Sequence, residues 1–279
     1  MRKLLSASFS RLWRNKEFWV CMGVMLAMAV GTLLNACRMA IRDAALYQQS
    51  VRCLDDYYFQ FGLFIGGFCA IFSSLFLGTE YSDGTLRNKI IVGHTRTDIY
   101  LANLLVSFAS TLLFLLAWAA GALVAVPTLG FWKMPADALL MYFAVAILFI
   151  AVFSAVFTAV AMLCSSKAYT VVISLVMFLV LMIISANVDN KLAEPEMNSS
   201  VEISAEGIQM GDPQPNPDYL SGAKREVYEF INDFLPTGQS IQMGYLKIAH
   251  PVRMILCSVF LTAAVTGGGL WAFRKKNLN

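Results

Sequence analysis

The chain has 279 residues, of which 58% are hydrophobic and 14% are charged. A water-soluble domain usually carries about 25% charged residues, so the composition excludes an ordinary soluble protein and indicates a polytopic membrane protein. The formal net charge of +3 is too small to indicate binding to nucleic acid, and we expect no nucleic-acid partner.

Six apolar runs are long enough to cross a membrane, since a helical span needs roughly 20 apolar residues. A backbone in lipid must satisfy its own hydrogen bonds, so the runs predict an all-α integral membrane protein with six transmembrane helices. The third and fourth runs exceed the thickness of a bilayer, which predicts tilt or an extension beyond it. The predicted spans are Phe18–Ala36, Phe59–Leu77, Tyr100–Val126, Ala138–Cys164, Tyr169–Val188 and Val252–Phe273.

Residues 1–17 are predicted to form an interfacial helix before the first span. Leu5, Phe9, Leu12 and Trp13 follow the i, i+4, i+7, i+8 spacing of one helix face. Basic residues lie mostly at other positions, as in an amphipathic helix that contacts membrane lipid in the headgroup layer. A solvated basic tail is the alternative, and it leaves the apolar spacing unexplained.

A short polar stretch, residues 78–99, separates the second and third spans. Gly84 and Gly93 bracket a segment that is predicted to be a short helix lying across the membrane surface. Thr95 or Thr97 is expected to cap the helix that runs into the third span. Composition alone favours an ordinary solvated loop, and a docking surface for another protein is the alternative. The charged residues of the stretch are Glu80, Asp83, Arg87, Lys89, Arg96 and Asp98.

The Lys and Arg residues of the short flanks are distributed unevenly between the two sides of the membrane. One side carries Arg2, Lys3, Arg11, Arg14, Lys16, Arg87, Lys89, Arg96, Lys167, Arg274, Lys275 and Lys276. The other side carries Arg38, Arg42, Arg52 and Lys133. Because cytoplasmic flanks are enriched in Lys and Arg, we expect both termini and residues 78–99 to be cytoplasmic.

The predicted extracellular loop, residues 189–250, is rich in acidic side chains. Its first part, which ends in GDPQPNPDYLSG, is expected to be irregular. Its second part predicts a helix on the outer rim of the membrane, with Ser221 as a plausible N-cap and Pro236 as its stop. The apolar face of this helix comprises Val227, Phe230, Ile231, Phe234 and Leu235, and Glu226, Glu229 and Asp233 are expected to face away.

The sequence lacks the motifs on which an enzyme assignment could rest. It has no GxxxxGK[ST] phosphate loop and no GxSxG nucleophile elbow. The two histidines, His94 and His250, are predicted on opposite sides of the membrane, so we expect no catalytic residues and no metal site. Cys37 and Cys53 flank the first outer loop, and unpaired thiols are favoured over a disulfide between them.

The interiors of the predicted spans contain almost no ionisable residues, whereas ion-driven carriers usually place acids or bases there. Their interior polar groups are hydroxyls, which are expected to hydrogen-bond between helices or to the backbone. These are Ser73, Ser74, Ser107, Ser110, Thr111, Ser154, Thr158 and Ser174. An energy source outside this chain is therefore favoured over an ion-driven carrier.

The stretch between the second and third spans carries a specific pattern: E-Y-x-x-G-T-L-R-N-K, then G-x-x-R, then I-Y-L-x-x-L-L. This pattern closely resembles the cytoplasmic connector of ABC-type-2 permeases, the membrane subunits of ATP-binding-cassette exporters. The layout of the whole chain and the segment FLPTGQ at residues 234–239 are similar to that family as well. The matching residues are Glu80, Tyr81, Gly84, Thr85, Leu86, Arg87, Asn88, Lys89, Gly93 and Arg96.

The resemblance implies that residues 78–99 are a coupling helix that docks on a nucleotide-binding subunit. Carried over by position, the coupling residues are Glu80, Tyr81, Gly84, Thr85, Leu86, Arg87 and Lys89. Among them, Glu80 and Tyr81 would anchor the elbow, and Gly84 would allow the tight bend. Leu86 would insert into the partner's groove, with Arg87 and Lys89 at its polar rim.

The resemblance also implies the partners and the location. ATP and Mg²⁺ would bind to a separate ATPase subunit, so this chain would need no cofactor, and a second permease chain, identical or homologous, would complete the path. Residues 1–279 would be one ABC-type-2 transmembrane domain in a bacterial plasma membrane. The expected function is export of, or immunity to, a peptide, a lipid-like compound or a drug, with the substrate-binding residues unassigned. The alternative is a non-transporting sensor or assembly subunit whose outer loop binds a ligand.

Overall fold

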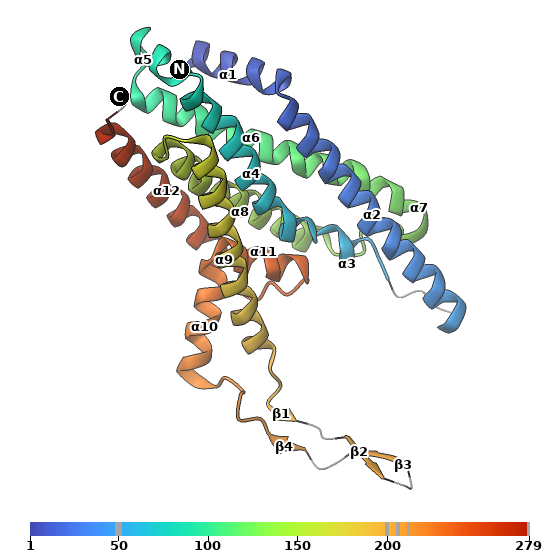
Figure 1. Ribbon diagram of the computed structural model, residues 1–279. Helices are drawn as coiled ribbons and strands as arrows, with labels where there is room; N and C mark the ends of the chain where they lie inside the picture. The colour runs from blue at the N-terminus through green and yellow to red at the C-terminus, as the bar shows by residue number, and fades with distance from the viewer. Residues whose placement is uncertain (48–51, 199–200, 205–206, 211–212, 278–279) are drawn as a thin grey trace.

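The computed structural model is a bundle of long helices, and it describes residues 1–47, 52–198, 201–204, 207–210 and 213–277 (Figure 1). Within these residues six helices are long and apolar enough to cross a membrane, which confirms the predicted all-α fold with six such helices. They are α2 (Lys16–Tyr47), α4 (Phe61–Ser82), α6 (Arg96–Ala122), α8 (Ala136–Leu163), α9 (Lys167–Ala193) and α12 (Pro251–Lys275).

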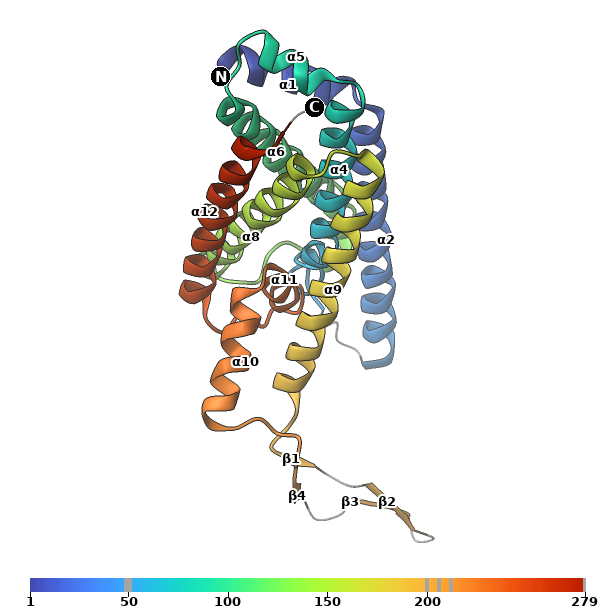
Figure 2. The same cartoon turned by 60° about the vertical axis from the view of Figure 1, so that its left-hand side comes forward.

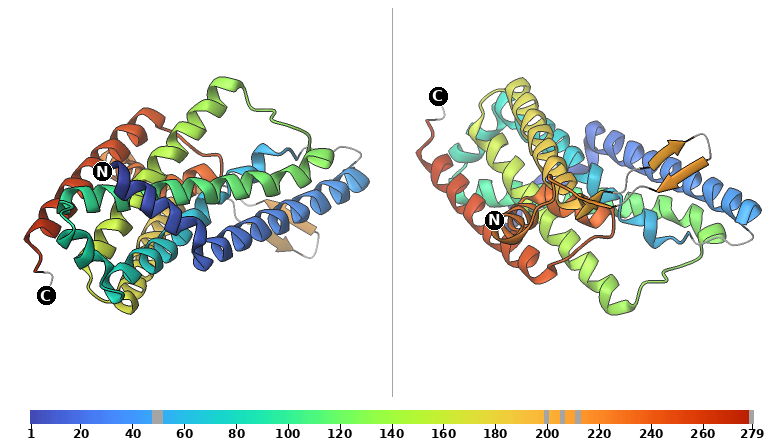
Figure 3. Two further views of the ribbon diagram at one scale, coloured as in Figure 1. Left: turned by 90° about the horizontal axis from the view of Figure 1, so that it is seen from above. Right: turned by 90° about the horizontal axis from the view of Figure 1, so that it is seen from below.

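The two ends of the bundle differ in what they carry. Both ends of the chain lie at one end of the bundle, here called the terminal end, together with α1 (Arg2–Arg14) and α5 (Thr85–Ile91) (Figure 1). The opposite end, here called the distal end, carries α10 (Gly222–Phe234) and the strands. The helices α12 and α2 lie on opposite flanks of the bundle (Figures 2 and 3).

Helix α4 lies in the middle of the bundle and packs against α6, α8 and α9. Large aromatic side chains fill the spaces around it, and Phe72 packs against Phe76 and Phe114 at centroid distances of 5.2 and 5.5 Å. Lipid tails are as apolar as these side chains, so close packing and hydrogen bonds hold such helices together more than removal from water does.

Hydroxyl groups join α4 to its neighbours inside the bundle, as expected from the sequence. The Ser73 and Ser107 hydroxyls are 2.5 Å apart and link α4 to α6. The Ser74 hydroxyl donates to Ser174 Oγ at 2.8 Å and links α4 to α9. Ser154 bonds instead to the carbonyl of Ile150 on its own helix. These hydroxyls are thus used in packing and in satisfying the backbone, whereas the buried Thr158 hydroxyl has no hydrogen-bond partner among the described residues.

Two of the long helices continue beyond the predicted ends of their spans. Helix α2 runs to Tyr47, because the charged residues after Ala36 end the apolar run but contain neither Gly nor Pro to end the helix. Helix α9 similarly runs to Ala193, into the predicted outer loop. A short 3₁₀ turn, Leu123–Ala125, and α7 (Val126–Leu129) extend α6, and α3 (Asp55–Tyr58) leads into α4. The described cysteine thiols, Cys37 and Cys53 included, are free.

The distal loop is more ordered than its composition predicts. The first part contains two small antiparallel pairs, β1 (Met197–Asn198) with β4 (Gln214–Pro215), and β2 (Val201–Ser204) with β3 (Gly207–Met210). An irregular segment was expected there because the loop is rich in Pro, Gly, Asn and Asp. The short runs VEIS and GIQM nevertheless alternate apolar and polar residues, and the register of β2 and β3 pairs Val201 with Met210 and Ile203 with Ile208.

The segment after α10 corrects a second expectation. Pro236 ends α10 as predicted, but it also occupies the first turn of a further helix, α11 (Pro236–Gly244), where its missing N–H is harmless. We expected Pro236 only to end the outer helix, yet a second helix begins there and every residue of it is buried. Helix α11 packs between α4, α8 and α9 near the distal end (Figure 2).

Candidate functional site

The stretch predicted to be the coupling helix is a compact turn at the tip of the terminal end. Helix α4 ends at Ser82, and Gly84 adopts a φ of +66°, a left-handed conformation that favours glycine. Helix α5 follows, and the side chain of Thr95 caps α6 by accepting from the Asp98 N–H at 3.1 Å. Of the two expected caps, Thr95 is therefore the one used.

The carboxylate of Glu80 joins three helices. Its side chain is 1% exposed, and its Oε1 lies 2.8 Å from Arg11 of α1 and 2.5 Å from Lys89 of α5. Its Oε2 accepts a hydrogen bond of 3.0 Å from the Asn103 amide of α6. We call these four residues the Glu80 hub. A buried carboxylate is costly unless it is paired, and here both of its oxygens are satisfied.

Arg11 is held in place by more than its ion pair. Its guanidinium lies 3.9 Å from the centroid of the Phe76 ring and donates to the Phe76 carbonyl at 3.2 Å. These contacts fix α1 against α4 one turn before Glu80. Sequence reasoning placed Arg11 in an amphipathic interfacial helix and left out Asn103, whose role depends on α6 crossing next to α4.

Tyr81 connects the end of α4 to α8 and to the residue after α12. Its hydroxyl donates to the carbonyl of Met162 in α8 and accepts a hydrogen bond of 3.0 Å from Lys276 Nζ. The same ammonium lies 4.2 Å from the centroid of the Tyr81 ring. Burial lowers the pKa of Lys276. The residue before the bend is therefore anchored to both α8 and the segment after α12.

Arg96, the first residue of α6, binds the end of α12. Its guanidinium donates to the carbonyls of Phe273, Arg274 and Lys276 at 3.0, 2.9 and 2.5 Å. The first two carbonyls belong to the last turn of α12 and the third to the residue after it, where unsatisfied acceptors and the helix dipole favour a cation. The start of α6 is in this way fastened to the end of α12.

Leu86 differs from the role that the family resemblance implied. Its side chain is 1% exposed and packs in a small core with Leu4, Tyr100 and Phe273. Leu86 is therefore not available to insert into a partner's groove. The contacts beneath α5 turn Leu86 inward, and they leave other residues of the helix to face outward. The exposed apolar side chains of the stretch are Ile91 and Val92, at 80% and 78%.

The remaining predicted residues divide between the hub and the surface. Arg87 is exposed, as a residue that meets a partner must be, whereas Lys89 is half-buried and already paired with Glu80. The Thr85 hydroxyl donates to the Glu80 carbonyl at 3.2 Å and closes the bend around Gly84. A hollow of about 340 Å³ lies between this bend, Ser165 and Asn277.

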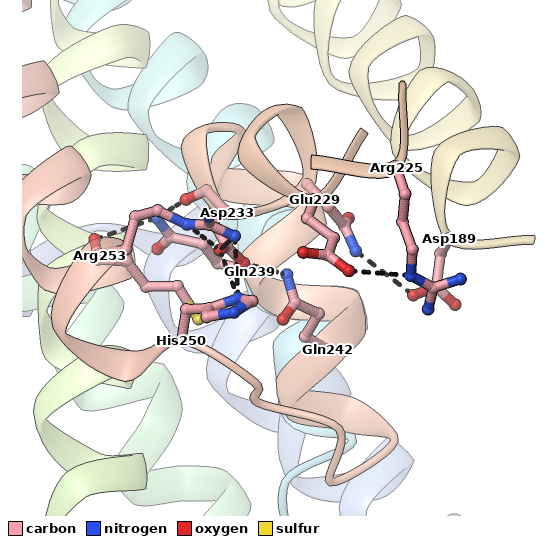
Figure 4. A network of polar contacts seen from close by, with 10 residues as sticks. Asp189, Arg225, Glu229, Asp233, Gln239, Gln242, His250 and Arg253 are labelled. Atoms are coloured by element: carbon pink, nitrogen blue, oxygen red, sulfur yellow. Dashed lines mark hydrogen bonds and ion pairs between the residues drawn. The ribbon is translucent and has the colours of Figure 1, made fainter. Parts of the chain in front are cut away.

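A second polar centre lies at the distal end, and the sequence analysis did not predict it (Figure 4). Asp233 was expected to face away from the protein, but its side chain is 2% exposed. Its carboxylate pairs with Arg253, with a hydrogen bond of 2.5 Å from Nε, and accepts from Gln242 Nε2 at 2.9 Å. His250 Nδ1 lies 3.2 Å from the same carboxylate.

Gln239 extends this network into the bundle. Its amide Nε2 donates to the Asp233 carbonyl at 2.7 Å, and its Oε1 accepts from the Ser258 hydroxyl at 2.8 Å. The network therefore connects α10, α11 and α12. Helix α11 is also bonded to α9, where the Ser185 and Thr237 hydroxyls are 2.6 Å apart. We call Asp233, Gln239, Gln242, Arg253 and Ser258 the distal network.

No group of three or more His, Cys, Asp or Glu side chains that could hold a metal ion occurs in the described part of the chain. Both polar centres consist mainly of ion pairs and of hydrogen bonds made by amides, and the Ser258 hydroxyl donates to an amide oxygen. Their arrangement suits mechanical connection between helices.

A comparison with known protein families matches residues 4–185 to the family described as ABC-2 family transporter protein. The matched range runs from α1 into α9 and includes every member of the Glu80 hub. A search of curated proteins found no match. The family match covers more than half of the chain. It includes four of the six long apolar helices of the described residues in full and most of a fifth, α9. The chain therefore belongs to the ABC-2 family and is the multi-pass membrane component of such a transporter, not its ATPase.

Proposed function

We propose that this chain is the permease of an ATP-driven exporter or immunity transporter, and that α5 and its flanks, residues 78–99, dock on the ATPase subunit that family membership implies. In this proposal the terminal end faces the cytoplasm of a bacterial cell, in keeping with the excess of Lys and Arg in its short flanks. A second permease chain, identical or homologous, completes the path by which the substrate crosses the membrane. The substrate is a peptide, a lipid-like compound or a drug.

The observation that carries the proposal is the connection of one exposed tip to four helices. The tip consists of Arg87, Ile91 and Val92. Behind it, the Glu80 hub reaches α1 and α6, and the contacts of Tyr81 and Arg96 reach α8 and α12. A push on the tip would therefore move these helices as one body, which is how closure of ATP-bound subunits would be transmitted to the path.

Ile91 and Val92 replace Leu86 as the proposed anchors in the partner's groove. Large apolar side chains that are about 80% exposed outside the lipid lose contact with water when a partner covers them. Arg87 is exposed next to them and would meet the polar rim. Leu86 would instead keep α5 attached to α6 and α12 from within.

Co-purification with the candidate ATPase tests the docking. We expect Ile91→Asp and Val92→Asp to lose the ATPase while the chain remains folded in the membrane. Leu46→Asp is the matched control, because Leu46 is 66% exposed at the end of α2 and should leave binding unchanged. Equal retention of the ATPase by all three variants would overturn the proposal.

A second measurement separates docking from transmission. Glu80→Gln keeps the exposed tip and disturbs the connection behind it, so we expect the ATPase to be retained and export to fall. Loss of binding together with export would mean that Glu80 acts at the docking surface itself. Full export by Glu80→Gln would show that the hub does not transmit the movement.

A further inference from the structure

A cavity at the distal end belongs to neither the tip nor the Glu80 hub. It has a volume of about 190 Å³ and is lined by residues from the end of α9 and from α10, next to the distal network. Figure 2 shows where these two helices lie, and Figure 4 shows several of the lining side chains. Gln242 of α11 and the segment from Lys247 to His250 complete its lining. We call it the distal cavity.

The charges that line the distal cavity are only partly paired. Asp233 is neutralised by Arg253, and Glu229 accepts a hydrogen bond of 3.1 Å from Arg225. Asp189 has no ion-pair partner within the described residues, and its contact is a long hydrogen bond of 3.4 Å from Asn232.

A cation on the same lining is also free. Lys247 has no carboxylate partner in the part of the chain that the structure describes, and its ammonium lies 5.7 Å from the centroid of the Tyr245 ring. Asp189 and Lys247 come from different elements, the end of α9 and the segment after α11. The cavity thus presents one free negative and one free positive charge, which suits a ligand that carries both signs.

The lining also indicates which kind of cation would be preferred. The described residues around the cavity include no Phe, Tyr or Trp, and quaternary ammonium groups are recognised by such rings. A primary ammonium has three N–H donors, and the carboxylate of Asp189 can accept them. A primary amine is therefore favoured over a choline.

The surroundings of the cavity indicate that the ligand has an apolar part. Helix α10 turns Arg225 and Asp233 toward the protein and leaves Val227 and Phe230 outward, 55% and 48% exposed. Apolar residues on the outer face of a helix are expected where the helix meets lipid. The cavity would then lie at the depth of the lipid headgroups.

A shallow apolar hollow on α12 adjoins the cavity at His250, which lines both. Its floor includes Val252 and Leu256, which are 68% and 64% exposed. An amphiphile could place its charged group in the cavity and its chain in this hollow.

We propose that the distal cavity binds the headgroup of a lipid that carries a primary ammonium and a phosphate, of the phosphoethanolamine type. The ammonium pairs with Asp189, the phosphate pairs with Lys247, and one acyl chain lies over Val252 and Leu256. The binding requires neither ATP nor the ATPase partner, so it stands apart from the function proposed for the tip.

Thermal unfolding of the purified chain in detergent, followed by tryptophan fluorescence, tests the proposal with dihexanoyl phosphatidylethanolamine as the probe. We expect stabilisation that is half-maximal at a concentration roughly tenfold lower than for the phosphatidylcholine or phosphatidylglycerol of the same chains, as for the loss of one charged hydrogen bond. Glycerophosphoethanolamine, which has the headgroup without chains, should be weaker by a similar factor.

Variants inside and outside the distal cavity test whether the lipid probe binds there. Asp189→Asn and Lys247→Gln should each weaken the response to the probe roughly tenfold, whereas Glu226→Gln and Lys224→Gln should not, because both residues are exposed on α10 outside the cavity. Each variant is first compared with the wild type without lipid, and Lys247→Gln, at an exposed residue, gives a test that is independent of the fold of α9.

Three results would overturn the proposal. Equal responses to the three dihexanoyl lipids would mean that the probe acts on the micelle and not on a site. An equal response to glycerophosphoethanolamine would mean a site for small soluble zwitterions, with no use of the hollow on α12. Unchanged affinity in both Asp189→Asn and Lys247→Gln would place any binding elsewhere.

Discussion

Replacing Glu80 by Gln tests whether the hub stabilises the terminal end. Glutamine keeps the size of the side chain and can still bond with Asn103, but it removes the charge that pairs with Arg11 and Lys89. Breaking a fully buried pair costs about 3–5 kcal/mol. The side chains of Arg11 and Lys89 are 32% and 19% exposed, so water can partly replace the lost partner.

We therefore expect Glu80→Gln to lower the free energy of unfolding by about 2 kcal/mol. For a chain of this size that corresponds to a decrease in Tm of roughly 4 to 8 °C. The assay is thermal unfolding in detergent, with Asp83→Asn as the control, because Asp83 is an exposed carboxylate close to the hub with no ion pair among the described residues. Equal Tm values for the two variants would refute the reasoning.

A double-mutant cycle makes the test specific to the ion pair. Lys89→Gln removes the partner that lies 2.5 Å from Glu80. If the two side chains interact as the structure indicates, the combined variant will lose less stability than the sum of the single variants. Additive losses would mean that the pair between Glu80 and Lys89 contributes no stability, and that any effect of the lost charge passes through Arg11.

Three further predictions concern single contacts, each measured as a change in Tm in detergent. Gly84→Ala places a Cβ on a left-handed residue and should cost about 1–2 kcal/mol. Gly238→Ala places a Cβ 2.2 Å from a backbone oxygen and should cost about 3 kcal/mol, whereas Gly267→Ala, which meets open space, should be neutral or slightly stabilising. Arg96→Gln removes the cation from the end of α12 and should cost about 1–2 kcal/mol, with the exposed Arg87→Gln as its neutral control. Equal Tm values within either matched pair, or an unchanged Tm for Gly84→Ala, would contradict the contact concerned.

Each of the two polar centres stabilises one end of the bundle. At the terminal end, the Glu80 hub connects α4 to α1, α5 and α6, and the exposed tip lies beyond these contacts. At the distal end, the distal network holds α11 inside the bundle by way of Asp233 and Gln239. Breaking either centre should therefore loosen one end and leave the packing of α4 in the middle intact.

Much of the architecture follows from local features of the sequence. The six apolar runs determine the six long helices, because a helix in lipid depends on the hydropathy of its own residues. A cap at Thr95 or Thr97 was also expected from the local sequence, and Thr95 is the one used. The bend at Gly84 was implied by the family resemblance, and its left-handed backbone suits glycine. The pattern around Glu80 also indicated the family before any contact was known.

Other features were decided by the tertiary structure alone. Leu86 is buried and Ile91 exposed, although both are apolar residues of one short helix. Asp233 faces inward because Arg253, on the helix after α11, supplies its partner. Helix α11 is buried because α4, α8 and α9 leave room for it. In a soluble protein the apolar face of a helix indicates the core. In a membrane protein both the core and the lipid are apolar, so hydropathy does not distinguish the face that packs from the face that lipid covers.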